Sequence, residues 1–122
     1  MTSVTQVDMN LKQKYALKKW QDLPLGGVIL EAGNARDYET GTWRTWKPIT
    51  HRENCTQCLA CWEFCPEDAI VLENGIGPDG KARKFVVDVN YYHCKGCGLC
   101  VRECPVNKAG VVQALEFVRD EV

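Results

Sequence analysis

Residues 55–66 read CTQCLACWEFCP, and residues 94–105 read CKGCGLCVRECP. Both stretches follow the pattern C-x₂-C-x₂-C-x₃-C-P, and a proline closes each run. Every cysteine of the first run has a counterpart 39 residues later (94 minus 55). These two runs hold all eight cysteines of the 122-residue chain, so the repeat decides how this part of the protein folds.

Disulfides, zinc and iron–sulfur clusters are the three explanations for these cysteines. The start of the chain, MTSVTQVDMN (1–10), lacks a secretory apolar core, which argues against export and disulfides. Structural zinc usually takes two well-separated CxxC pairs rather than four cysteines within eleven residues. Three cysteines at this spacing let one tight loop reach three corners of a [4Fe–4S] cube. The spacing therefore favours two [4Fe–4S] clusters.

The fourth cysteine of each run has a special position in this motif. In doubled runs it ligates the cluster of the other run, a general rule for the motif that we apply without deriving it. We expect cluster one on Cys55, Cys58, Cys61 and Cys104, and cluster two on Cys94, Cys97, Cys100 and Cys65. Crossed ligation would tie both runs into one unit, in a domain whose apolar core is small.

The two loops differ in glycine content. Gly96 and Gly98 should let backbone N–H groups approach the sulfurs of cluster two, where the first loop has Gln57 and Leu59. After the second run the chain reads CPVNKAGVV, where the first reads CPEDAIVL. Aligning Ala69 with Ala109 makes the second segment one residue longer.

Composition indicates a folded, soluble protein. Hydrophobic residues make up 45% and charged residues 25% of the chain. No apolar run approaches the ~18 residues that span a bilayer. A net charge of −1 gives no reason to expect nucleic-acid binding. We therefore expect a cytoplasmic protein with neither a membrane nor a nucleic acid as partner.

Secondary structure is predicted only coarsely. Residues 8–20 have weak helical periodicity, and VILEA (28–32) suggests a short strand. AIVLE (69–73) and KFVVDV (84–89) predict two more strands, joined by a turn. Short helices are expected near residues 62–64 and 101–103.

The first 49 residues contain no cysteine and need a separate explanation. We divide the chain into a docking arm, residues 1–49, and a two-cluster domain, residues 50–122. Two tryptophans and two cations in the arm are typical of an interface anchor: Trp43, Arg44, Trp46 and Lys47.

No catalytic set is visible in the sequence: there is no Ser/His/Asp combination and no phosphate-binding glycine loop. His51 and His93 are either cluster tuners or ordinary turn residues. Trp62, Tyr91 and Tyr92 either shield the clusters from water or pack in the core.

Residues 50–110 resemble bacterial two-cluster ferredoxins, which implies an α+β fold, here with an N-terminal extension for docking. The preceding stretch, GGVILEAGNARDYETGTWRTWKPI (26–49), resembles the delta subunit of 2-oxoacid:ferredoxin oxidoreductases. That family includes pyruvate, 2-oxoisovalerate and phenylglyoxylate enzymes. Three features carry the resemblance: Gly26-Gly27, Gly41-x-Trp43-Arg44 and Lys47-Pro48.

The resemblance implies an electron-transfer subunit of an oxidoreductase complex, without catalysis by this chain alone. Partner subunits would bind thiamine diphosphate and coenzyme A and decarboxylate a 2-oxo acid. Electrons would leave through the two iron–sulfur clusters to ferredoxin or a flavoprotein. The alternatives are a free, diffusible two-cluster ferredoxin and an iron–sulfur subunit of another redox complex.

Overall fold

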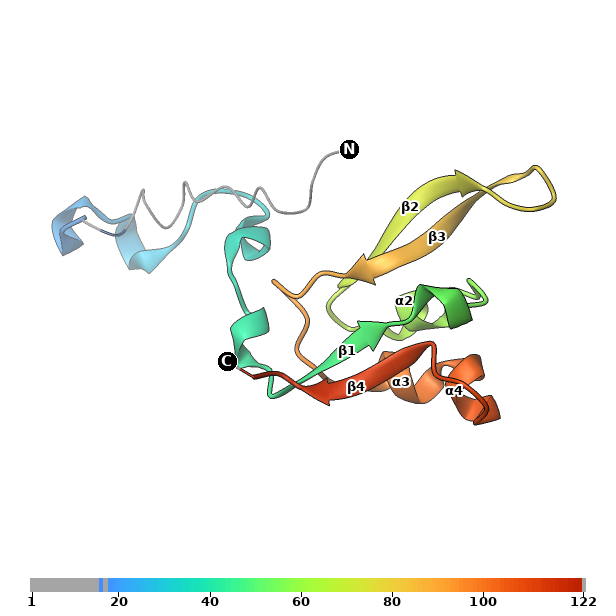
Figure 1. Cartoon of the computed structure of the whole chain (residues 1–122). Coiled ribbons are helices and arrows are strands. Elements are labelled where there is room, and N and C mark those ends of the chain that lie inside the picture. Colours follow the sequence, from blue (N-terminus) through green and yellow to red (C-terminus); the bar gives the residue numbers. More distant parts are fainter. Residues whose placement is uncertain (1–15, 17, 122) are drawn as a thin grey trace. The chain divides into compact units, whose positions relative to one another are not determined.

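The computed structural model describes residue 16 and residues 18–121. The chain forms two compact units, Met1–Glu39 and Thr40–Val122, which we describe separately (Figure 1). Most of the helix expected over residues 8–20 lies outside the described residues. Within those residues, no helix is long and apolar enough to cross a membrane.

The described part of the first unit consists of short 3₁₀ turns: η1 (Trp20–Asp22), η2 (Leu25–Gly27) and η3 (Asn34–Asp37). None of its described residues is buried. The strand predicted at residues 28–32 is wrong, because this stretch is not paired with another strand. A strand needs a neighbour to satisfy its backbone N–H and C=O groups.

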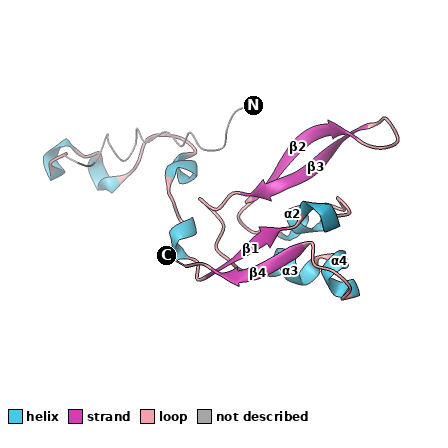
Figure 2. Ribbon diagram, in the orientation of Figure 1, coloured by secondary structure: helices cyan, strands magenta, loops and turns pink. Residues whose placement is uncertain are grey.

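The second unit contains two antiparallel strand pairs (Figure 2). Strand β1 (Trp46–Thr50) pairs with β4 (Leu115–Arg119), and β2 (Ile70–Ile76) pairs with β3 (Ala82–Val89). The two strands predicted between the cysteine runs are thus confirmed. The boundary between the compact units lies between Glu39 and Thr40, whereas the sequence placed it between residues 49 and 50. The second unit begins earlier because β1 pairs with the C-terminal strand β4.

Short helices follow the loops that carry the cysteines. Helices α2 (Ala60–Phe64) and α3 (Leu99–Glu103) each begin one residue before the third cysteine of a run, which confirms the expected helices. Helix α4 (Pro105–Ala109) begins at the proline that closes the second run. Two further 3₁₀ turns, η4 (Gly41–Trp43) and η5 (Arg52–Asn54), flank β1.

Two backbone hydrogen bonds show how the repeats correspond. The His51 N–H donates to Ala114 O at 2.8 Å, and the Asn90 N–H donates to Ala69 O at 2.6 Å. His51 and Asn90 are separated by the same interval as the paired cysteines, so Ala114 is the counterpart of Ala69. The expected match with Ala109 is wrong, because helix α4 and the turn after it lengthen the second segment.

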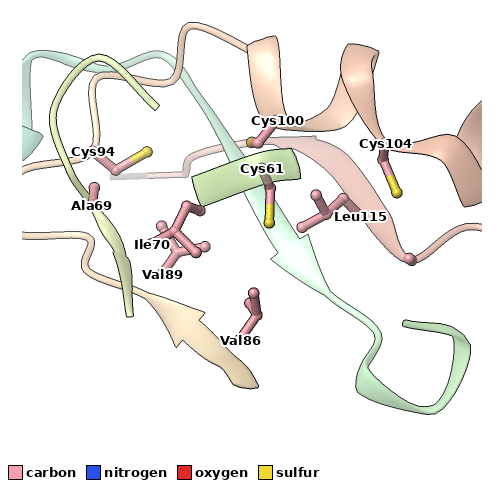
Figure 3. Packing of buried hydrophobic residues seen from close by; sticks show 10 residues of the cluster. Cys61, Ala69, Ile70, Val86, Val89, Cys94, Cys100, Cys104 and Leu115 are labelled. Carbon is pink, nitrogen blue, oxygen red and sulfur yellow. The ribbon is translucent and has the colours of Figure 1, made fainter. Parts of the chain in front are cut away.

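The core of the second unit is built largely around sulfur. Four buried cysteines, Cys61, Cys94, Cys100 and Cys104, pack with six apolar residues: Ala69, Ile70, Val86, Val89, Ala114 and Leu115 (Figure 3). The fold thus places the cysteines and the strand ends in one cluster.

Candidate iron–sulfur centres

The eight cysteines are free thiols and separate into two groups of four. Cys104 joins the first three cysteines of the other run in lining one pocket, with Cys55, Cys58 and Cys61. Cys65 lines a second pocket with Cys94, Cys97 and Cys100. The fourth cysteine of each run therefore lies with the three leading cysteines of the other run, the grouping expected from the motif.

The donor chemistry of these pockets fits iron–sulfur cubes. Each pocket offers four thiols, the number that a [4Fe–4S] cube needs. Among the described residues, no three His, Cys, Asp or Glu side chains are close enough to hold a single metal ion. The four sulfurs surround a space instead, and apolar side chains such as Leu115 in the first pocket and Ile70 in the second complete its lining.

Exposure follows the repeat at the second and third cysteines of each run. The second cysteine of each run, Cys58 or Cys97, is exposed, and the third, Cys61 or Cys100, is buried. Each pocket therefore has one cysteine that is exposed at the protein surface. An electron carrier could approach either pocket closely on that side.

Burial changes the acidity of the inner thiols. It raises the pKa of Cys61 to about 11, against the lowering effect of the Trp62 N–H. Burial likewise raises the pKa of Cys100 to about 12. These thiols are protonated near pH 7 in the cluster-free chain, so cluster assembly must displace their protons.

Backbone N–H groups point at the sulfurs of both pockets. In the first pocket, the Gln57 N–H donates to Cys55 Sγ at 3.4 Å. In the second, a backbone hydrogen bond from Gly96 opposes the rise in the pKa of Cys94 that burial causes, as does the nearby Arg44 guanidinium. Gln57 and Gly96 occupy equivalent positions with φ of 58° and 66°. The predicted role of Gly96 is confirmed, and Gln57 provides the same contact without being glycine.

The two loops are held in place differently. A Cβ atom on Gly96 would clash with the Trp46 carbonyl oxygen and lie 3.1 Å from Arg44 Cβ, so the second loop packs directly on β1. Gln57 instead ties the first loop to β3: its Oε1 accepts the Val86 N–H at 2.7 Å, and its Nε2 donates to Val86 O at 3.3 Å. The Gly98 carbonyl accepts the Arg102 N–H at 3.0 Å at the start of α3, and the predicted contact of the Gly98 N–H with a sulfur stays a prediction.

The predicted interface anchor separates into inward and outward residues. Arg44 is only 12% exposed and forms an ion pair with Asp120 at 2.6 Å. Its Nη1 donates to the carbonyl oxygens of Gly41, at 2.9 Å, and of Tyr91. Lys47 also pairs with Asp120, at 2.8 Å. Arg44 therefore points inward rather than toward a partner, whereas the docking role of Lys47, which is 29% exposed, stays a prediction.

The two tryptophans of the predicted anchor face outward. Trp43 is 64% exposed, and Trp46 stacks on Phe117 with ring centroids 5.7 Å apart while remaining partly exposed. Their predicted role in docking stays a prediction.

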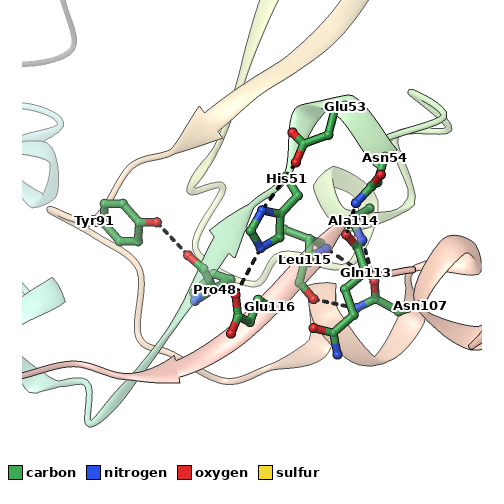
Figure 4. Close-up of polar contacts among 10 residues, drawn as sticks. All are labelled: Pro48, His51, Glu53, Asn54, Tyr91, Asn107, Gln113, Ala114, Leu115 and Glu116. Atoms are coloured by element: carbon green, nitrogen blue, oxygen red, sulfur yellow. Dashed lines mark hydrogen bonds and ion pairs between the residues drawn. The ribbon is translucent and has the colours of Figure 1, made fainter. Parts of the chain in front are cut away.

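Several sequence candidates lie away from the pockets. Neither histidine and none of the three aromatic residues Trp62, Tyr91 and Tyr92 lines either pocket. His51 Nε2 lies 3.0 Å from Glu116 Oε2 and its Nδ1 lies 3.7 Å from Glu53 Oε1, so its ring bridges two carboxylates (Figure 4). The Tyr91 hydroxyl donates to Pro48 O at 2.6 Å.

Charged residues that sequence reasoning missed do line the pockets. Lys95 and Glu67 line the second pocket and form an ion pair at 3.1 Å. Arg52, which is exposed, lines the first pocket. The only sequence signal was their position within two or three residues of a cysteine.

Comparison with known proteins agrees with this geometry. Residues 54–108 match the model of the 4Fe-4S dicluster domain, a span that includes all eight cysteines. The chain is 42% identical over 106 residues to pyruvate synthase subunit PorD of Thermotoga maritima, covering 87% of this chain and 98% of the relative. It is 43% identical over 98 residues to pyruvate synthase subunit PorD of Methanocaldococcus jannaschii, covering 80% and 95%. It is 42% identical over 80 residues to ketoisovalerate oxidoreductase subunit VorD of Pyrococcus furiosus, covering 66% of each chain.

Proposed function

This chain belongs to the delta subunits of the 2-oxoacid:ferredoxin oxidoreductases, and from that membership we propose a specific ligand set for each of its two [4Fe–4S] clusters. Cluster one is assigned to Cys55, Cys58, Cys61 and Cys104, and cluster two to Cys94, Cys97, Cys100 and Cys65. The composition of the two pockets supports this assignment. The chain is the electron-transfer subunit of an oxidoreductase, and each cluster supplies a one-electron redox centre.

Paired cysteine substitutions test the ligand sets. Under crossed ligation, Cys58→Ser with Cys104→Ser damages one site, so the holo chain should keep about four of its eight iron atoms. Cys58→Ser with Cys65→Ser damages both sites and should leave almost no iron. Ligation within each run predicts the reverse order of iron contents, and that order would overturn the assignment. Cys58 serves in both pairs because it is exposed and contributes little to packing.

The partners follow from the family. We assign thiamine diphosphate, coenzyme A and the decarboxylation of a 2-oxo acid to partner subunits. The names of the relatives, pyruvate synthase and ketoisovalerate oxidoreductase, support this division of labour. Ferredoxin or a flavoprotein accepts the electrons. We place the complex in the cytoplasm, where free thiols remain reduced before clusters are inserted.

The docking role of residues 1–49 is part of the same proposal. Leu25 is 98% exposed and Leu30 is 74% exposed, and both lie in a unit without buried described residues. Val28, Ile29 and Leu30 form a contiguous run of exposed apolar side chains, which is typical of a surface that a partner covers. We therefore assign this segment to a contact with the other subunits of the complex.

Anaerobic affinity purification of the tagged chain from its own host tests the assembly. Recovery together with subunits that bind thiamine diphosphate is the expected result. Recovery of a lone, brown monomer would overturn the assignment to a complex and favour a free ferredoxin.

A further inference from the structure

The surroundings of the two pockets differ although the cysteine runs repeat. Arg44 lies against the loop of the second pocket, with Nη1 3.5 Å from the carbonyl oxygen of Cys94. It is 12% exposed, so solvent screens its charge only weakly. Arg52, the cation lining the first pocket, is exposed, and water screens it more strongly.

The charges around Arg44 do not cancel. Asp120 pairs with both Arg44 and Lys47, so two cations share one carboxylate and leave a net charge of +1. Lys95 at the second pocket is balanced by Glu67. The loop of the second pocket therefore lies beside an excess of positive charge on a side chain that is only 12% exposed.

The second pocket is also favoured by hydrogen bonds to sulfur. The Ala69 N–H donates to Cys65 Sγ at 3.2 Å, in the second pocket. Four residues after Cys104, the Lys108 N–H instead donates at 3.0 Å to the carbonyl oxygen of Cys104, because helix α4 begins there, and the N–H of Ala114, the counterpart of Ala69, donates to Asn107 Oδ1. The first pocket thus lacks the equivalent of the Ala69 contact among its described bonds.

We propose that the Arg44 guanidinium, with the Ala69 N–H, gives the site of Cys65, Cys94, Cys97 and Cys100 the higher reduction potential of the two. This inference rests on the proposed ligand sets. Reduction adds one electron to the site and breaks no bond. A nearby cation and N–H donors to sulfur stabilise the added negative charge, so this site takes up the first electron.

An anaerobic redox titration of the full holo chain, followed by electron paramagnetic resonance, tests the proposal. The unsubstituted chain should show two separate one-electron steps. Arg44→Gln should lower the reduced-to-oxidised ratio of the higher-potential step about tenfold at a fixed solution potential, equal to about 59 mV for one electron. Arg44→Lys should restore most of the loss. Arg83→Gln, a charge removal in the exposed β2–β3 hairpin, is the matched control and should shift neither step.

A second substitution distinguishes the effect of the Arg44 charge on the potential from the effect of a disrupted fold. Asp120→Asn removes the carboxylate that offsets Arg44, so the same ratio should rise severalfold. Structural damage alone would not shift the potential in opposite directions for Arg44→Gln and Asp120→Asn. An unchanged higher step in Arg44→Gln, or shifts of equal sign in both variants, would overturn the proposal.

The responding site is identified in a chain that keeps only one cluster. Cys58→Ser with Cys104→Ser leaves the second site, where Arg44→Gln should have its full effect. Cys94→Ser with Cys65→Ser leaves the first site, where the effect should be small. A larger effect at the first site would overturn the tuning role, whereas failure of the ligand sets would already appear in the iron contents.

Discussion

The Tyr91 hydroxyl donates a 2.6 Å hydrogen bond to the carbonyl oxygen of Pro48, in the middle of β1 (Figure 4). Pro48 is fully buried, so this oxygen depends on a protein partner. Burial raises the pKa of Tyr91 to about 12, so the hydroxyl keeps its proton near neutral pH. The contact joins the segment before the second cysteine run to the strand that precedes the first.

Tyr91→Phe removes this donor and keeps the ring. We expect the free energy of unfolding to fall by about 1–2 kcal/mol, because the Pro48 carbonyl loses its partner. The temperature at which half of the visible cluster absorption is lost should then fall by roughly 4–8 °C per kcal/mol. The cluster absorption at low temperature should be unchanged. An unaltered midpoint would show that water or another donor satisfies Pro48.

Gly96→Ala should damage the second cluster site far more than strain alone explains. Gly96 and Gly110 have similar backbone conformations, with φ of 66° and 75°. Of these two glycines, Gly96 has a backbone oxygen where the new Cβ would lie, whereas nothing lies within 4 Å of that position at Gly110. Gly110→Ala should therefore lower the free energy of unfolding by only about 1–2 kcal/mol, the strain of a Cβ in a left-handed conformation, whereas Gly96→Ala should displace its loop from β1. Iron content after purification checks this, and equal iron contents in both variants would contradict it.

Gln57 combines a left-handed backbone with two side-chain hydrogen bonds. Two substitutions can separate the energy of the backbone strain from that of the hydrogen bonds. Gln57→Ala keeps the strain and loses both bonds to Val86. Gln57→Gly loses the bonds and relieves the strain, which costs roughly 1 kcal/mol for a residue with a Cβ. Gln57→Gly should therefore be the more stable variant by that amount, measured by thermal loss of cluster absorption. The opposite order would mean that the loop needs the stiffness of a non-glycine residue.

The spacing of the cysteines was enough to predict much of the fold of the second unit. The repeated cysteines indicated the groups that the pockets bring together, and the helices follow at the expected places. The second segment was predicted to be longer by too few residues, because Ala109 and Ala114 are both small residues before an apolar stretch. Only the bond from His51 identifies Ala114 as the counterpart of Ala69.

The inward position of Arg44 could not be predicted for a similar reason. Its pairing carboxylate, Asp120, lies at the other end of the chain, and both become neighbours only when β1 pairs with β4. A cation between two tryptophans has the same local sequence whether it faces a partner or its own backbone. The pattern therefore indicated the residue types of an interface without their orientation.

Asn107 connects three elements, and its loss should be costly. Its Nδ2 donates to Leu115 O at 2.7 Å and its Oδ1 accepts the Ala114 N–H at 2.9 Å (Figure 4). The same Nδ2 also donates to Val101 O at 3.1 Å. Asn107→Ala should lower the free energy of unfolding by about 2–3 kcal/mol, because several backbone groups lose their partners. Lys108→Ala, on the same helix, removes only a surface ion pair with Glu103 and should cost less than about 1 kcal/mol. Equal thermal midpoints for the two variants would contradict this role of Asn107.

Leu25→Lys tests whether the first unit contacts the other subunits. Leu25 is 98% exposed in the chain alone, so the substitution should leave the iron content and thermal midpoint unchanged. If a partner covers this side chain, a buried unpaired ammonium would be costly, and recovery of the complex should fall at least tenfold. Ile76→Lys is the matched control, because Ile76 is 75% exposed at the end of β2 in the other unit. Loss of assembly in Leu25→Lys alone is the expected result. Normal assembly of Leu25→Lys would show that Leu25 is not part of the docking surface. Loss of assembly in both variants would show that the contact includes the β2–β3 hairpin.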